Sequence, residues 1–195
     1  MNPATTIRGR MPTFTAAHPT QKSGKLPHAI AATLRAPPIS PASDPSVNPA
    51  RRPRSCMIRD QAVKRAISEV YEEARADAYR DRPPSASGSR QPLSAAPVLI
   101  VACVDTPTSS QAGFQTGASI YPSVQNLMLA ARALGLGTVL TTLHRRRKAR
   151  IHEILGIPDG VESAAIIPLG WPDREYGPNR RPPLERFVMR DRWSR

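Results

Sequence analysis

Residues 118–144 read ASIYPSVQNLMLAARALGLGTVLTTLH, and this stretch combines a helix, a turn and a strand. The helix is expected to open at Tyr121-Pro122-Ser123, and Gly135 and Gly137 are placed to end it through a left-handed cap. A short strand is predicted at residues 139–143. Apolar residues that recur at helical spacing along one face predict the helix. They are Val124, Leu127, Met128, Ala131 and Leu134.

Upstream of this stretch, residues 61–79 form the clearest helical pattern, with acids outside the apolar stripe. The residues of this stripe are Val63, Ala66, Ile67, Val70 and Ala74. Residues 80–93 are rich in Pro, Ser, Gly and Arg, which indicates a surface loop. The run PVLIVACVD at residues 97–105 is typical of a buried strand. Polar residues 106–117 then predict a second loop.

Downstream, residues 146–155 carry apolar side chains on one helical face, and Gly156-Ile157-Pro158 should end that helix. The run SAAIIPLGW at residues 163–171 predicts another buried strand. From residue 175 the chain becomes a tail rich in Pro and Arg. Loosely alternating helices and strands favour the α+β class, with helices flanking a mixed or antiparallel sheet, over a strict βαβ array.

The N-terminal part differs in character from the rest. Residues 1–57 hold ten of the 22 prolines and a single acid, Asp44, with scattered apolar residues. Such a segment buries too little apolar surface to offset the entropy of ordering, so we expect it to be largely irregular apart from a short helix at residues 28–35. The predicted organisation is a divergent segment, residues 1–57, followed by one folded domain, residues 58–195.

The composition of the 195-residue chain narrows the possible functions. Its formal net charge of +13 attracts anionic partners without choosing among them. Cys56 and Cys103 lie far apart without metal-ligand spacing, so we expect no disulfide framework, no metal site and a reducing, cytoplasmic setting. No apolar run is long enough to span a membrane. Common phosphate-binding and hydrolase motifs are also absent.

Five motifs in order carry a resemblance to a known family. They are residues 118–127 (ASIYPSVQNL), 130–144 (AARALGLGTVLTTLH), 154–158 (ILGIP), 167–172 (IPLGWP) and 180–185 (RRPPLE). In this order and spacing they resemble the nitroreductase family, over about residues 58–193. The resemblance implies a nitroreductase-like α/β sandwich that forms a homodimer, with FMN in a cleft at the dimer interface and a C-terminal tail that reaches the partner subunit.

The same resemblance implies a function. Members of the family are FMN-dependent oxidoreductases that pass hydride from NAD(P)H to a nitroaromatic, a quinone or a similar small-molecule electron acceptor. Backbone groups of Thr141, Thr142 and Leu143 would face the flavin ring, whereas Arg181, with Arg180 as a neighbouring candidate, would contact the FMN phosphate. Because FMN performs the hydride chemistry, no catalytic side chain is required, and none is identified.

The family pattern fails between Pro38 and Met57. A Gly-Gly-Asn-aromatic stretch and a strand would stand there in an intact member, but these residues contain neither glycine nor an aromatic residue, and prolines interrupt any strand. A sheet strand and part of the cofactor wall are therefore expected to be missing. A disturbed reading frame and a divergent tail on a partial fold both explain this loss.

An alternative function remains open from the residues alone. The chain could be a catalytically impaired fold relic, or a basic protein that binds acidic partners through residues 1–57 and 145–150. Arg180 and Arg181 could equally be solvated charges in a basic tail, Thr141 and Thr142 strand formers, and His144 a loop residue. Nucleic-acid binding is not expected, because aromatic residues do not interleave with the basic ones, and neither is a membrane-surface role.

Overall fold

The computed structural model describes residues 14–15, 53–81, 91–106, 112–173 and 181–193. Within them, five strands form a sheet with the order β1-β5-β3-β2, and β4 also pairs with β5. All of the pairings are antiparallel. The strands are β1 (Phe14–Thr15), β2 (Pro53–Ile58), β3 (Val98–Asp105), β4 (Gly137–Thr138) and β5 (Val161–Pro172).

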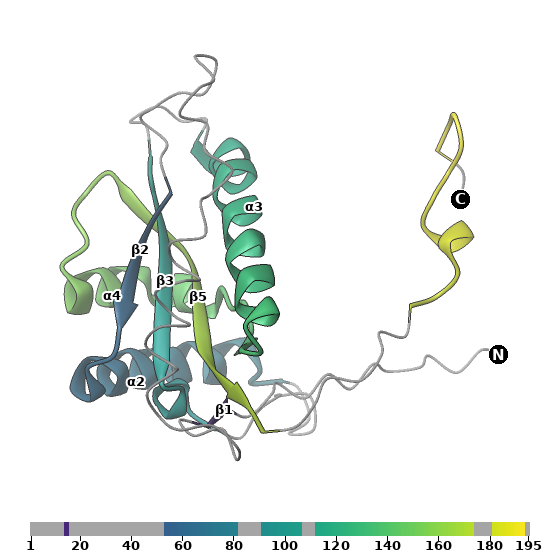
Figure 1. The fold of residues 1–195 in the computed structure, drawn as a ribbon. Coiled ribbons are helices and arrows are strands. Elements are labelled where there is room, and N and C mark those ends of the chain that lie inside the picture. The colour runs from purple at the N-terminus through teal and green to yellow at the C-terminus, as the bar shows by residue number, and fades with distance from the viewer. Residues whose placement is uncertain (1–13, 16–52, 82–90, 107–111, 174–180, 194–195) are drawn as a thin grey trace, which may run out of the picture.

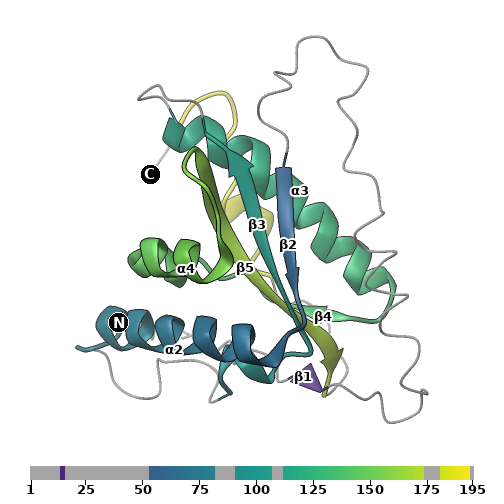
Figure 2. The same cartoon turned by 90° about the vertical axis from the view of Figure 1, so that its left-hand side faces the viewer.

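Helices cover both faces of the sheet. Helix α3 (Ala112–Ala133) lies on one face, whereas α2 (Gln61–Ala78) and α4 (Lys148–Leu155) lie on the other (Figures 1 and 2). Strand β3 supplies both cores, because its side chains alternate between the two faces. Those at even positions, such as Ile100, pack toward α3, and those at odd positions, such as Val101, pack toward α2 and α4. The predicted α+β sandwich is confirmed.

Helix α2 begins where the sequence pattern placed it. The Asp60 side chain caps its N-terminus, since Oδ1 accepts hydrogen bonds from the amides of Ala62 and Val63, both at 2.9 Å. This satisfies two of the amides that a helix start leaves without partners. The buried face also includes three residues outside the predicted stripe, namely Lys64, Ser68 and Tyr71.

Helix α3 is longer than predicted. It begins at Ala112, so residues 112–117, expected as loop, are helical, and Pro122 lies inside the helix instead of opening it. Proline in a helix interior removes one backbone hydrogen bond, and it is usually found in the first turn. The prediction relied on this local preference of proline. Burial of Ile120 and Val124 against the sheet, on either side of the proline, outweighs that preference and keeps the helix continuous.

The end of α3 follows the prediction at one of its two glycines. Gly135 has a φ of +80°, and its amide bonds to the Arg132 carbonyl while the Leu136 amide bonds to that of Ala131. This pair of bonds is the Schellman arrangement. Gly137, in contrast, already belongs to β4.

Strand β2 corrects the expectation that no strand forms between Pro38 and Met57. Pro53 pairs with Val104 and Ile58 with Leu99, along the whole of β2. Pro53 is tolerated in β2 because it is the first residue of a strand that lies at the edge of the described sheet. The helix expected at residues 28–35 lies outside the described residues.

Three short 3-10 helices complete the described chain: η4 (Leu93–Ala95), η5 (Leu143–Arg147) and η6 (Leu184–Arg186). The helix predicted at residues 146–155 is split between η5 and α4, and Gly156 ends it in the left-handed conformation as expected. The predicted strands at residues 97–105 and 163–171 are confirmed as β3 and the longer β5. Residues 181–193, with η6, stand apart from the sandwich (Figure 1).

Candidate functional site

The segment that follows β4 is anchored along β5. Gly137 pairs with Gly170, Thr138 with Leu169, and an isolated bridge joins Thr141 to Ile166 in the same register. The strand predicted at residues 139–143 therefore lies two residues earlier, and Leu143 already begins η5. In this register the hydrogen-bonded pair before Thr141–Ile166 would be Val139 with Pro168. Proline has no N–H to donate, which accounts for the interrupted ladder.

Thr141 is buried, and its polar groups are engaged within the protein. Its amide donates to the Ile166 carbonyl at 3.0 Å, and its carbonyl accepts from the Ile166 amide at 2.9 Å. Its Oγ1 lies 2.9 Å from the phenol oxygen of Tyr71 on α2. The Leu143 amide donates to the same Oγ1 at 3.5 Å. Thr141 is therefore an anchor, whose amide and carbonyl both bond to β5.

Thr142 is the exposed residue of this segment. Its carbonyl accepts a hydrogen bond from the Arg145 amide at 3.1 Å. Among the described residues, none accepts a hydrogen bond from the Thr142 amide. Of the three residues predicted to present backbone groups to a flavin, Thr142 thus has an amide to offer. Leu143 is half-buried and packs against the core under α2 and α4.

His144 forms a second buried anchor directly after this segment. Its Nε2 lies 3.2 Å from the Ser163 carbonyl oxygen, which requires the proton on Nε2. Nδ1 is buried and has no partner among the described residues. Burial lowers the pKa of His144 to about 4, so the ring is neutral at physiological pH. The side chain is therefore part of the core and not a loop residue.

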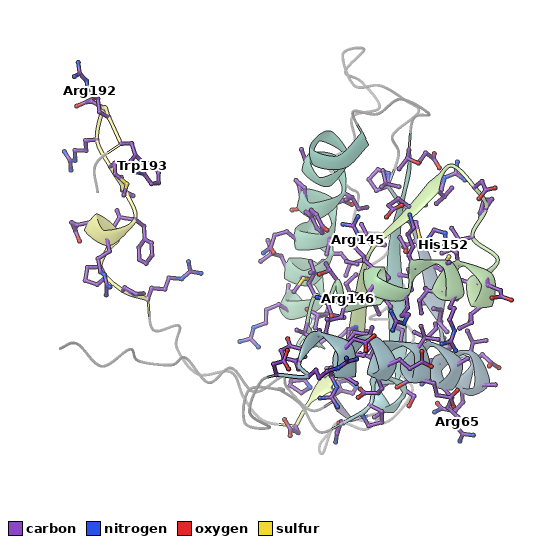
Figure 3. The ribbon with its side chains drawn as sticks, turned by 180° about the vertical axis from the view of Figure 1, so that it is seen from behind. Arg65, Arg145, Arg146, His152, Arg192 and Trp193 are labelled. Atoms are coloured by element: carbon purple, nitrogen blue, oxygen red, sulfur yellow. The ribbon has the colours of Figure 1, made fainter. Side chains whose placement is uncertain are left out.

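The two predicted phosphate ligands lie elsewhere in the chain. Arg180 lies outside the described residues. Arg181 is exposed and begins the C-terminal segment that stands apart from the sandwich, as Figure 3 shows for Arg192 and Trp193 on the same segment. The structure therefore brings Thr141, Thr142 and Leu143 together but does not bring Arg181 to them.

The basic run at residues 145–150 is mostly neutralised by acids. Arg145 and Lys148 contact Glu162 at 3.3 Å and 2.8 Å. These contacts and the ion pairs from α2 explain how a helix start tolerates so many cations, which its dipole disfavours. Arg146 is exposed and makes no ion pair within the part of the chain that is described (Figure 3). The pairs with α2 are Arg147 with Glu73 and Asp77, and Arg150 with Glu73.

Sequence reasoning missed Tyr71, which contacts the site from α2. The predicted stripe on that helix included the preceding residue, Val70, and the pattern gave no sign that a phenol would reach a residue 70 positions away. Within the described ranges, no helix is long and apolar enough to cross a membrane. The same residues contain no group of three or more side chains able to hold a metal ion.

Comparison with known proteins identifies what this arrangement is similar to. The family model described as the nitroreductase family matches residues 51–171, more than half of the chain, which confirms the resemblance seen in the sequence. A Methanothermobacter thermautotrophicus protein, provisionally named NADH dehydrogenase/NAD(P)H nitroreductase, is 37% identical over 84 residues. That alignment covers 42% of this chain and 44% of the relative, so this chain matches less than half of that relative's length.

Two further comparisons cover more of the chain. An Archaeoglobus fulgidus protein with the same provisional name is 31% identical over 148 residues, which are 70% of this chain and 72% of that protein. Among solved structures, the NADPH:FMN oxidoreductase from Vibrio harveyi complexed with NAD+ superposes with a TM-score of 0.66. It is 18% identical, and the match covers 96% of this chain and 76% of that chain, so this likeness supports the fold alone.

Proposed function

Because this chain belongs to the nitroreductase family, we propose that it is an FMN-dependent oxidoreductase. The proposed reaction takes hydride from NAD(P)H and delivers electrons to a nitroaromatic, a quinone or a similar small-molecule acceptor. The single observation that carries the proposal is the family match over residues 51–171, which runs from β2 to the last but one residue of β5. The provisional name of the Archaeoglobus fulgidus relative, which mentions NAD(P)H, points the same way.

The exposed Thr142 fits a flavin by its chemistry. When bound, FMN supplies the hydride chemistry, and the protein supplies binding and orientation. A reduced flavin ring is electron-rich at one edge, and a fixed amide donor is a natural complement to such a group. Thr142 offers an amide without a described acceptor, and the neighbouring anchors Thr141 and His144 hold it in place.

Arg181 suits the phosphate of the cofactor. Its guanidinium is exposed and has no acidic partner among the residues that the structure describes. A guanidinium can bind a phosphate with two parallel hydrogen bonds. Arg180, next to it in the sequence, is the second candidate. In the proposed enzyme both arginines, which belong to the C-terminal part of the chain, would contact the FMN phosphate.

We further propose that the enzyme is a homodimer that uses α3 as its interface. Leu129 on this helix is 57% exposed. Leu134, the first residue after the helix, is 40% exposed. Exposed large apolar side chains favour a protein contact where they form one patch. Light scattering after gel filtration should give twice the chain mass, and Leu129→Lys should shift it to one chain. Met57→Lys removes an exposed apolar residue on β2 and should leave the dimer intact.

Flavin binding tests the proposed function directly. Purified full-length protein should have the visible absorption of a flavin, or acquire it on titration with FMN, and should then oxidise NADH or NADPH when a quinone or nitroaromatic is present. A colourless protein that does not bind added FMN would contradict the proposal. That outcome would leave the fold relic as the better account.

The phosphate contact can be separated from the ring contact. Riboflavin has the same ring as FMN but lacks the phosphate. Arg181→Gln should therefore weaken FMN binding about fivefold or more while riboflavin affinity stays the same. Arg186→Gln, in the same segment, is the matched control and should change neither affinity. Equal weakening of both ligands by Arg181→Gln would argue against a phosphate contact.

A further inference from the structure

Tyr71 reaches the candidate site from the buried face of α2. The residue is 3% exposed, and its phenol oxygen lies 2.9 Å from Thr141 Oγ1 in the interior of the protein. Burial raises the pKa of Tyr71, so the phenol keeps its proton at physiological pH. A hydrogen bond between two neutral hydroxyl groups therefore joins α2 to the segment that follows β4.

Thr141 also forms hydrogen bonds with Leu143 and Ile166, so it connects Tyr71 to both. Its hydroxyl also accepts a hydrogen bond from the Leu143 amide at 3.5 Å, which closes a small turn around Thr142. Its backbone is fixed to Ile166 of β5 by two hydrogen bonds. Threonine is branched at Cβ and has few rotamers, so a partner for its hydroxyl fixes the side chain in one of them. The position of the turn thus depends on Tyr71 as well as on the sheet.

Thr142 is held between two buried anchors. On one side is the Tyr71–Thr141 hydrogen bond, and on the other is the His144 ring against the Ser163 carbonyl. The exposed residue itself makes one described backbone hydrogen bond, from the Arg145 amide to its carbonyl. The direction of its amide is therefore set mainly by buried groups that a ligand does not touch.

We propose that Tyr71 is a positioning residue, whose hydrogen bond to Thr141 fixes the direction of the Thr142 amide toward the ring of bound FMN. This inference rests on the proposed function. A misdirected amide makes a weaker hydrogen bond, and the loss is larger for the electron-rich reduced ring than for the oxidised one. Loss of the Tyr71 hydroxyl should consequently lower both the affinity for FMN and the reduction potential of the bound flavin.

The test compares two single variants and their double variant with the wild-type full-length protein. Tyr71→Phe and Thr141→Val each remove one hydroxyl of the pair and keep nearly the same shape. Each should raise the FMN dissociation constant about fivefold and shift the flavin potential to more negative values. If the pair acts as a unit, the double variant should show no larger change than either single variant.

Two controls separate positioning from stability. Thr141→Ser keeps the hydroxyl and should retain wild-type affinity and potential. Ser68→Ala removes a buried hydroxyl without a described partner from the same helix and should change neither quantity. The midpoint of thermal unfolding, measured without flavin, reports the structural cost of each substitution.

The outcomes are distinguishable. If Tyr71→Phe lowers only the unfolding midpoint, while FMN affinity and potential match the wild type, Tyr71 is structural and the inference is overturned. If the wild type binds FMN and both hydroxyl-deleting variants change affinity and potential together, the inference is supported. If the wild type itself fails to bind FMN, the proposed function fails first, and the inference is overturned with it.

Discussion

Lys64 lies on the buried face of α2, and its Nζ donates a hydrogen bond to the carbonyl of Ala96 at 2.8 Å. Ala96 stands just before the start of β3. A second bond reaches the Pro97 carbonyl at 3.2 Å. Burial lowers the pKa of this lysine, and the two carbonyls partly offset the cost of burying its charge. The side chain therefore ties α2 to the start of the central strand.

Loss of this lysine should destabilise the fold. Lys64→Met keeps the apolar stem but leaves both carbonyls without their donor, so we expect the free energy of unfolding to fall by about 1–2 kcal/mol. Urea denaturation at neutral pH measures it. Arg65→Met changes the neighbouring exposed cation (Figure 3) and should stay within about 0.5 kcal/mol of the wild type. Equal stability of the two variants would contradict the role of Lys64.

His144 should make the protein sensitive to mild acid. Its pKa is about 4 in the folded chain and near 6.5 when unfolded, so below pH 6.5 the unfolded chain binds a proton that the folded chain does not. Stability is therefore lost as the pH falls from 6.5 to 4, by up to about 3 kcal/mol from this residue.

Comparison with variants isolates this effect from the acids that titrate in the same range. His144→Gln can still donate to the Ser163 carbonyl but does not titrate, so its stability should change less between pH 6.5 and 4 than that of the wild type. The pKa of His152 is also lowered by burial, and its Nε2 lies 3.0 Å from Ser163 Oγ. His152→Gln should therefore also reduce the change in stability between pH 6.5 and 4, but by less than His144→Gln does. Parallel profiles for His144→Gln and the wild type would refute the assignment.

Two glycines in the left-handed conformation should respond differently to alanine. A Cβ at Gly135 would contact the Trp171 ring at 3.4 Å, whereas one at Gly156 would meet nothing within 4 Å. Both changes incur the backbone cost of about 1 kcal/mol. Gly135→Ala should therefore be the more destabilising variant in thermal or urea unfolding. A larger effect at Gly156 would contradict this ranking.

The two cysteines should differ in reactivity. Burial raises the pKa of Cys103 to about 12, which leaves almost no reactive thiolate at neutral pH. Cys56 lies on the edge strand β2 and is partly exposed. Titration with a disulfide reagent should modify Cys56 quickly in the native protein and Cys103 only after denaturation. Cys56→Ser should abolish the fast reaction, and a persistent fast reaction in that variant would contradict the expected burial.

The parts of the fold that depend on local pattern were predictable from the sequence. The β-branched runs around Val101 and Ile166 required buried strands, and the stripe with Ile67 required a helix. Pro122 and Pro53 misled the prediction because proline reports only local backbone preference, whereas burial against the sheet and an edge position decide whether it is tolerated.

The candidate site was less predictable than the fold. Sequence alone indicated Thr141, Thr142 and Leu143 as a group, through family resemblance, but it could not assign different roles to them. Those roles depend on which side chains are buried and on partners far away in the chain, such as Tyr71. The family position of Arg181 stays a prediction, because its approach to the site involves the C-terminal segment outside the sandwich.

The exposed Thr142 between two buried anchors has a consequence for how such a protein can change over generations. Under the proposed function, a substitution at this one position would change the side chain next to the ligand while the hydrogen bonds of Thr141 and His144 keep the backbone in place. The residues that maintain the backbone and the residue that can vary are thus different residues, close together in the sequence. A library restricted to position 142 should consequently yield folded proteins in most of its members.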